Sequence, residues 1–252
     1  MSSAAQLVLV LVEPAGPLNV GSVARLAANF GLQQLRLVAP RCDHLGEEAR
    51  RMAVHAQPLL ERAHLFTDLA AALADCRRVV ACSGRVDSDA VPMEPPSGAL
   101  AWLLAADGEA PSALVFGRED RGLSIDELLL ASRVLRISTD DGYPSLNLSH
   151  AVAIALHELR RLAAVAPATP AEVNGEAETD AGDPALRGDL EASLSDAEDL
   201  LLEVGFLLPH TRHARMAKVR ALLQRARITS EEVALVRGMV RQLRWASRRP
   251  TP

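Results

Sequence analysis

Three short segments of this 252-residue chain carry side chains that can do chemistry. The first holds an amide and an arginine, the second four charges between two glycines, and the third a series of hydroxyl and amide groups. Such groups can hold a ligand or balance a developing charge. We therefore predict that the three segments build one active site. They are residues 19–25 (NVGSVAR), 117–122 (GREDRG) and 143–149 (YPSLNLS).

The first segment follows an apolar run and a turn that contains two prolines and Gly16. Asn19 stands where a helix N-cap is needed. Because Gly21 lacks a side chain, a phosphate could approach the free N–H groups of the helix's first turn, and Arg25 would lie in the second turn near that end. An ordinary capped helix with a solvated arginine fits the spacing equally well. The GxGxxG pattern of dinucleotide sites is absent.

The second segment directly follows an apolar run, where a parallel sheet presents its ligand-binding edge. Four charges between Gly117 and Gly122 favour a functional turn over a solvated loop.

In the third segment, polar residues alternate with leucines just before a helical period, and Asn147 or Ser149 could simply cap that helix. His150 and His157 share a helix face but have no carboxylate or cysteine at ligand spacing. We therefore expect packing or surface histidines and no metal site.

Apolar runs alternate with helical periods over the first 160 residues, which predicts an α/β fold with a mainly parallel sheet covered on both faces. The expected strands are 7–12, 35–39, 78–82, 113–116 and 134–137, and the expected helices are 19–30, 59–74, 98–105, 123–132 and 148–162.

The chain divides into an α/β domain (1–164), a flexible acidic linker rich in Pro, Gly and Ala (165–189) and a basic helical tail (190–252). Helices are expected at about 193–207, 211–226 and 230–246. The net charge is −5, yet residues 212–249 hold eleven Lys and Arg against two Glu.

The basic tail side chains can contact phosphates without reading sequence. A solvated helix face or a dimer-packing element is the alternative. The candidate RNA contacts are Arg212, Arg215, Lys218, Arg220, Arg225, Arg227, Arg241 and Arg244.

Composition excludes several other classes of protein. The three cysteines lack paired short spacing, which argues against a zinc site or a disulfide scaffold and fits a reducing cytoplasm. No apolar stretch reaches the roughly 18–20 residues that cross a membrane. Aromatic residues make up 3% of the chain, which argues against base recognition by rows of stacked rings.

In this order and spacing, the three segments resemble motifs of the SPOUT class of S-adenosylmethionine-dependent RNA methyltransferases, in particular the TrmH/TrmJ branch, which methylates ribose 2′-hydroxyls. The likeness continues through ACSGR (81–85) and into the tail (RALLQRARITSEEVALVRGMVRQL), so it covers nearly the whole chain apart from the linker. It implies a trefoil knot over about residues 79–160 and a homodimer whose site is completed across the interface.

The resemblance also implies roles for individual residues. Arg25 matches the catalytic arginine, and Asn19, Glu119, Ser145 and Asn147 complete the expected catalytic set. Because a free arginine stays protonated, we interpret Arg25 as orienting a phosphate and stabilising the developing alkoxide, whereas proposals for the family make it a base assisted by RNA phosphate. The implied contacts to S-adenosylmethionine are Cys82, Ser83, Gly84, Gly117, Ile137, Leu146 and Ser149.

The resemblance implies 2′-O-methylation of tRNA at nucleotide 32 of the anticodon loop by a cytoplasmic homodimer that needs neither metal nor membrane. The same chemistry at another tRNA or ribosomal RNA site is one alternative, and a non-catalytic RNA-binding protein of the same fold is another. No motif encodes the choice of base.

Overall fold

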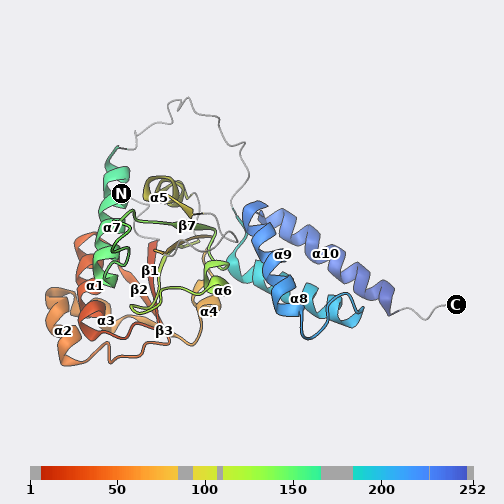
Figure 1. Ribbon diagram of the computed structural model, residues 1–252, viewed down its shortest axis with the longest axis horizontal. Coiled ribbons are helices and arrows are strands. Elements are labelled where there is room, and N and C mark those ends of the chain that lie inside the picture. The colour runs from red at the N-terminus through yellow and green to blue at the C-terminus, as the bar shows by residue number, and fades with distance from the viewer. Residues whose placement is uncertain (1–6, 85–92, 107–109, 166–183, 227, 249–252) are drawn as a thin grey trace.

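A parallel sheet forms the centre of the N-terminal domain in the computed structural model, which describes residues 7–84, 93–106, 110–165, 184–226 and 228–248 (Figure 1). The sheet has seven strands in the order β3-β2-β1-β6-β4-β7-β5, and every strand pairing in the described chain is parallel. The strands are β1 (Leu7–Val12), β2 (Gln34–Val38), β3 (His64–Phe66), β4 (Arg78–Cys82), β5 (Met93–Glu94), β6 (Ser112–Phe116) and β7 (Arg133–Leu135).

Helices cover both faces of this sheet, as the sequence predicted. They are α1 (Pro17–Asn29), α2 (Glu47–Ala53), the 3-10 turn η2 (Val54–Ala56), α3 (Gln57–Glu61), α4 (Leu69–Leu73), α5 (Pro96–Leu104), α6 (Ile125–Leu128) and α7 (Leu148–Val165). The tail adds α8 (Arg187–Glu203), α9 (Arg212–Ala226) and α10 (Ser230–Ser247).

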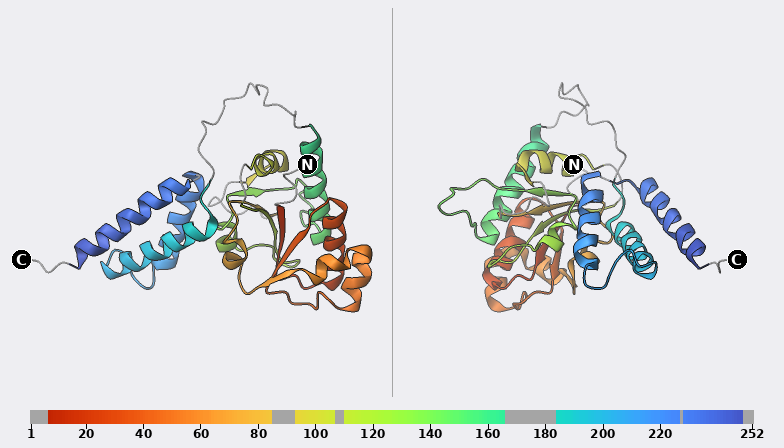
Figure 2. Two further views of the ribbon diagram at one scale, coloured as in Figure 1. Left: turned by 180° about the vertical axis from the view of Figure 1, so that it is seen from behind. Right: turned by 45° about the vertical axis from the view of Figure 1, so that its right-hand side comes forward.

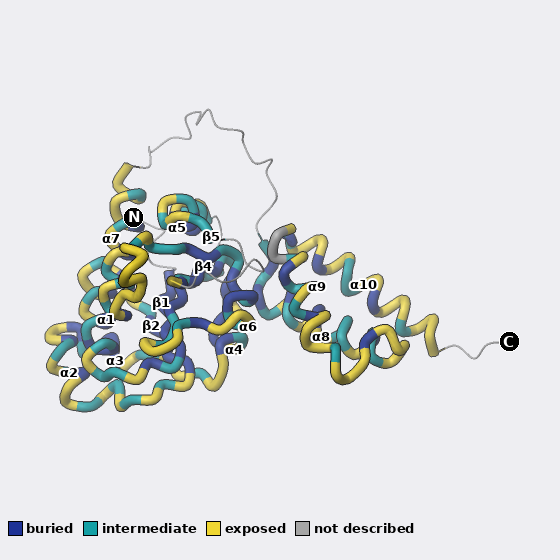
Figure 3. The backbone as a smooth tube through the Cα atoms, viewed as in Figure 1, coloured by how far each residue is buried: buried dark blue, intermediate teal, exposed yellow. Residues whose placement is uncertain are grey.

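The central strand β1 shows why both faces need cover. All six of its residues are buried (Figure 3). Its leucines join the core formed with α1, α5 and α7, and its valines join a second core on the other face, because side chains alternate along a strand. The short helices α4 and α6 cover this second face only in part, and α9 of the tail adds Ala217 and Ala221.

The tail therefore packs on the α/β domain, as the views in Figure 2 also show. Helix α8 begins at Arg187, six residues before the predicted start and inside the segment predicted as linker. Its first N–H groups reach the turn after α4: Arg187 N donates to the Cys76 carbonyl (2.9 Å) and Gly188 N to the Ala74 carbonyl (3.0 Å). Most of the predicted linker, residues 166–183, lies outside the described residues.

Two predicted helices of the α/β domain are also wrong in extent. The segment predicted as one helix over 59–74 contains the end of α3, then β3 and α4. His64 starts a short strand paired with β2, and Asp68 then caps a new helix, its Oδ1 accepting from Ala71 N at 2.8 Å. Helix α6 covers a single turn inside the predicted 123–132, with Ser124 and Glu127 forming a capping box. Strand β5 was not predicted.

The start of α1 also differs from prediction. Pro17 occupies the first helical position, where its fixed φ suits a helix, and Gly16 is the N-cap residue. Asn19 is therefore not the cap but the third residue of the helix, and Arg25 lies in the third turn rather than the second.

Gly21 has a packing role that the sequence did not predict. A Cβ atom there would lie 2.2 Å from the Ala49 carbonyl oxygen of α2. The backbone that approaches Gly21 is thus α2 of the same chain, and the prediction of a phosphate at this glycine is wrong.

Among the described residues, no helix has the length and hydropathy to cross a bilayer.

Gly21→Ala should lower the free energy of unfolding by about 1–3 kcal/mol, because the added methyl group forces α1 and α2 apart. Gly238→Ala on exposed α10 is the matched control: apart from the neighbouring backbone of its own helix, no described atom lies within 4 Å of the new Cβ, so helix propensity should raise stability by up to about 1 kcal/mol. Urea unfolding followed by circular dichroism measures both. Equal effects of the two variants would contradict the close contact.

Candidate functional site

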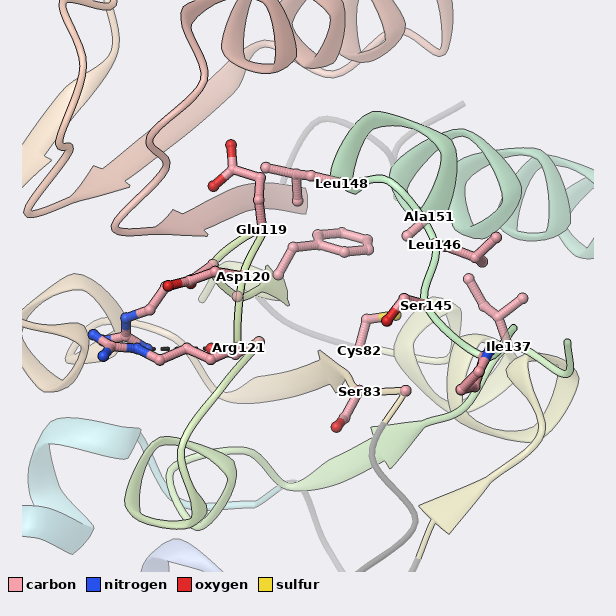
Figure 4. A pocket seen from close by; sticks show the side chains of 16 residues that line it. Cys82, Ser83, Glu119, Asp120, Arg121, Ile137, Ser145, Leu146, Leu148 and Ala151 are labelled. Carbon is pink, nitrogen blue, oxygen red and sulfur yellow. Dashed lines mark hydrogen bonds between the residues drawn. The ribbon is translucent and has the colours of Figure 1, made fainter. Parts of the chain in front are cut away.

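A cavity of about 380 Å³ opens at the carboxyl ends of β4, β6 and β7, at the sheet edge where parallel strands present ligands (Figure 4). Its volume falls in the range of small-molecule sites. The lining residues are Cys82, Ser83, Gly84, Phe116, Gly117, Arg118, Glu119, Asp120, Arg121, Gly122, Ile137, Pro144, Ser145, Leu146, Leu148 and Ala151.

This lining brings together most of the residues singled out from the sequence. Six of the seven candidate cofactor contacts line the cavity, and Ser149 does not. Glu119 and Ser145 of the candidate catalytic set also line it. Pro144 and Leu148 lie in the predicted segment 143–149 but had no assigned role. Phe116 and Ala151 were not predicted, because their apolar pattern is that of ordinary core residues.

The turn after β6 needs both of its glycines. A Cβ atom on Gly117 would lie 2.4 Å from the Gly122 carbonyl carbon and 2.4 Å from Leu123 N. Gly122 itself has φ +68°, a conformation that L side chains rarely adopt. The chain therefore doubles back tightly, and Arg118 and Gly122 form an antiparallel bridge.

Arg118 fixes this turn to its surroundings. Its two terminal nitrogens donate to the two carboxylate oxygens of Glu127 at 2.8 and 2.9 Å, and it also pairs with Glu13 after β1. The Arg118 side chain is only 10% exposed. Hydrogen bonding to Arg118, with the charges of Arg118 and Arg41, outweighs burial and lowers the pKa of Glu13 to about 2. The charged turn is thus anchored at two places and is not a freely solvated loop.

Glu119 accepts hydrogen bonds at the start of α1. Its Oε2 accepts from Ala15 N at 3.1 Å, and its Oε1 accepts from Gly16 N at 3.0 Å and from Asn19 Nδ2 at 3.2 Å. Burial raises the pKa of this carboxyl, but the hydrogen bonds outweigh burial and hold the pKa below its usual range. A carboxylate with these partners is a poor proton acceptor at neutral pH.

Asn19 connects this carboxylate to the third segment. Because its Nδ2 donates to Glu119, its Oδ1 is left to accept, and it does so from Asn147 Nδ2 at 3.0 Å. Asn147 Oδ1 in turn accepts from Ser149 N (2.9 Å) and Ser149 Oγ (2.8 Å), so that Asn147 caps α7. The N-cap alternative for Asn147 is therefore confirmed, and that for Ser149 is not.

We call this series, Glu119–Asn19–Asn147, the carboxylate–amide chain. It joins all three segments of the sequence analysis. Each amide has one orientation that satisfies all of its partners, so the chain sets the relative positions of α1, the turn after β6 and the start of α7.

Cys82 lines the cavity with an unreactive thiol. Burial raises the pKa of its thiol to about 12, so the group stays protonated and un-nucleophilic at neutral pH. No group of three or more metal-ligating side chains occurs in the described part of the chain, and His150 and His157 are exposed.

Arg25 does not reach the cavity of its own chain. It is exposed on α1, is not among the lining residues, and has no hydrogen bond or ion pair with any described residue. One chain therefore offers a ligand cavity without its expected arginine.

The candidate RNA contacts whose side chains are described fall into two groups. Four have partners within the tail: Arg212 with Glu198 (3.5 Å), Arg215 with the Phe206 carbonyl (2.7 Å), Arg220 with Glu191 (3.0 Å) and Arg244 with the Asp196 carbonyl (2.6 Å).

Lys218 and Arg241, by contrast, are exposed and have no hydrogen bond or ion pair with a described residue. The side chain of Arg225 and the whole of Arg227 lie outside the described residues.

Comparison with known families gives two separate matches on this chain. The model of the SpoU rRNA Methylase family matches residues 6–157, and that of the tRNA methyltransferase TrmJ C-terminal domain matches residues 188–251. The first match contains the cavity, and the second covers the three tail helices except for Arg187, the first residue of α8.

Individual relatives agree with these matches. The chain is 37% identical over 234 residues to the tRNA (cytidine/uridine-2′-O-)-methyltransferase TrmJ of Klebsiella pneumoniae, covering 92% of this chain and 93% of that protein. The crystal structure of TrmJ from Z. mobilis superposes with a TM-score of 0.79 at 30% identity, covering 94% and 98% of the two chains.

A third similar structure, from work on the 2-OH methylation of C/U34 on tRNA, has a TM-score of 0.51 at 30% identity. It covers 63% of this chain and 96% of that chain.

Proposed function

The chain belongs to the SpoU methylase family and carries a TrmJ-type C-terminal domain, and from this we propose that it is a tRNA methyltransferase. It would transfer a methyl group from S-adenosylmethionine to the ribose 2′-hydroxyl of a cytidine or uridine. The observation that carries the proposal is the 37% identity over 92% of the chain to an enzyme of that activity. The cavity lies inside the matched region.

The cavity suits S-adenosylmethionine in size and in chemistry. Ile137, Leu146 and Leu148 offer apolar surface for the aromatic ring of the cofactor. The strand ends offer backbone groups for the polar atoms of that ring. A Cβ atom on Gly84 would contact only the Pro144 carbonyl, at 3.7 Å, so the backbone there is open to a ligand. When bound, the cofactor supplies an electrophilic methyl group.

The residues of this chain would act mainly by alignment, which brings the ribose oxygen to attack distance. Glu119 would hold the turn in place and would not take the proton, because its lone pairs already accept three hydrogen bonds. The protonated Cys82 thiol would not compete as a methyl acceptor.

Arg25 requires a second copy of the chain. Because it lies outside its own cavity, we propose a homodimer in which Arg25 of one chain reaches the RNA bound at the cavity of the other. There it would orient a phosphate and stabilise the alkoxide. The trefoil knot over residues 79–160 stays a prediction, as residues 85–92 and 107–109 lie outside the described residues.

We assign the target as nucleotide 32 of the anticodon loop. The relative concerned with C/U34 corresponds to only 63% of this chain, whereas the TrmJ C-terminal domain model matches the tail. The tail thus favours a TrmJ-type substrate, and nucleotide 34 is the alternative. With tRNA as its substrate, the enzyme would act in the cytoplasm.

Purified protein incubated with S-adenosylmethionine and bulk tRNA should produce 2′-O-methylcytidine or 2′-O-methyluridine at nucleotide 32, mapped by mass spectrometry of nuclease fragments. Arg25→Lys should lose at least 100-fold in kcat/KM, because lysine lacks the forked guanidinium geometry. Calorimetry should show unchanged cofactor affinity for this variant.

Methylation at nucleotide 34 alone would refute the assigned position. Absence of transfer to any tRNA by a protein that binds the cofactor would refute the activity. Near-full activity of Arg25→Lys would rule out the geometric role of Arg25.

For the tail, we propose that the unpaired Lys218 and Arg241 contact RNA phosphates, whereas the partnered arginines mainly hold the tail together. Replacing both Lys218 and Arg241 by Ala should weaken tRNA binding and reduce the slope of log Kd against log salt by roughly one per residue. Cofactor affinity should not change. Filter binding at several salt concentrations measures the slope.

Arg220→Ala is the matched control. It removes one positive charge but leaves Glu191, whose side chain is 18% exposed, without its partner. The tail should therefore lose thermal stability, with a smaller change in the salt slope. Equal slope changes per charge removed would contradict the division into two groups.

A further inference from the structure

Tyr143 is the only tyrosine of the chain, and it is 80% exposed. No other large hydrophobic residue of the described chain is as exposed. It lies in the connection between β7 and α7, which projects from the domain as a green loop in the right-hand view of Figure 2. An aromatic ring held in solvent is a common feature of surfaces that bind a partner.

The backbone around Tyr143 is held in place although its side chain is not. Tyr143 N donates to the Asp140 carbonyl at 3.1 Å, and Gly142 N donates to Asp140 Oδ1 at 2.9 Å. Thr139 Oγ1 donates to the Pro144 carbonyl at 3.2 Å. The turn and Pro144 together fix the backbone position of Tyr143. Binding a ligand with its ring would therefore cost little conformational entropy of the backbone.

Tyr143 directly precedes residues that line the cavity. Pro144, Ser145 and Leu146, the three residues that follow Tyr143, all line the cavity, and Figure 4 shows Ser145 and Leu146 beside it. The ring is therefore attached at the rim of the cavity.

Other rings of the α/β domain are engaged in its interior. Trp102 packs between Arg78 and Arg133, whose guanidinium carbons lie 5.0 and 4.8 Å from its ring, and Phe116 is buried. Phe30 and Phe66 pack against the two cores. Among the described aromatic residues of this domain, Tyr143 is the one whose ring is mainly exposed.

The charge of the loop decides which part of an RNA the ring can take. Asp140 and Asp141 are both exposed beside Tyr143 and would repel a phosphate. A base is uncharged, and its face stacks on aromatic rings. We propose that Tyr143 is a positioning residue that stacks on the base of the nucleotide whose ribose is methylated, an inference that rests on the proposed function.

Stacking of this kind accepts any base, so Tyr143 would hold the nucleotide without choosing between cytidine and uridine. Its effect would lie in RNA affinity. The chemical step would stay with the groups that align the ribose and the methyl donor.

The test compares Tyr143→Ala and Tyr143→Phe on two full-length tRNAs. One is unmodified, and the other has an abasic ribonucleotide at the target position, which keeps the 2′-hydroxyl but removes the base. On unmodified tRNA, Tyr143→Ala should raise the Kd from filter binding and the KM for methyl transfer five- to hundred-fold. Tyr143→Phe should stay within two-fold of wild type. On the abasic tRNA, Tyr143→Ala should change the Kd less than two-fold.

Leu65→Ala, at a 57% exposed residue of the edge strand β3, is the control for loss of exposed apolar surface and should bind both RNAs like wild type. Equal weakening of both tRNAs by Tyr143→Ala would overturn the proposal, as would an unchanged Kd. Weakened cofactor binding would make the ring a cofactor lid, and a shift to monomer in light scattering would make it a dimer contact; either result also overturns it.

The Kd measurement does not depend on turnover. One outcome is that Tyr143→Ala weakens the binding of unmodified tRNA but not of abasic tRNA, while the wild type transfers no methyl group. The proposed function then fails and the stacking stands. If wild type methylates tRNA but Tyr143→Ala changes nothing, the stacking fails alone.

Discussion

The hydrogen bond from Asn147 Nδ2 to Asn19 Oδ1, 3.0 Å long, joins two residues 128 positions apart, and the site depends on it. Through it, the carboxylate–amide chain connects the first turn of α1, the charged turn after β6 and the cap of α7. The turn after β6 and the start of α7 line the cavity, and the start of α1 is held to that turn by Glu119. Their positions relative to one another are set by buried strands on one side and by this chain of polar groups on the other.

Charge pairing extends the same principle outward. Arg118 ties the turn after β6 to Glu13 and Glu127, and its low exposure makes these pairs stronger than surface ion pairs. In the tail, acidic α8 pairs with several arginines of α9 and α10, whereas Lys218 and Arg241 are exposed and have no ion pair with a described residue. In both places a dense set of charges divides into members that build structure and members that remain available to a ligand.

Much of the fold was predictable because burial on both faces of a parallel sheet leaves continuous apolar runs, and β1 and β4 match their predicted ranges. The failures have local causes. The segment 59–74 has enough apolar residues for a helix, but its strand forms only because β2 offers an edge at Arg36–Val38. Asn19 is a residue type that is common at helix N-caps, but the helix already begins at Pro17. The carboxylate–amide chain was not predictable from spacing, since it depends on strand order.

We infer that the carboxylate–amide chain acts as one unit in forming the cavity. A double-mutant cycle tests it, with the affinity for S-adenosylmethionine measured by calorimetry for wild type, Asn19→Ala, Asn147→Ala and the double variant. Each single change should weaken binding about ten-fold, and the double variant should be hardly weaker than either, a coupling of at least about 1 kcal/mol. Independent effects that multiply to about a hundred-fold would contradict it.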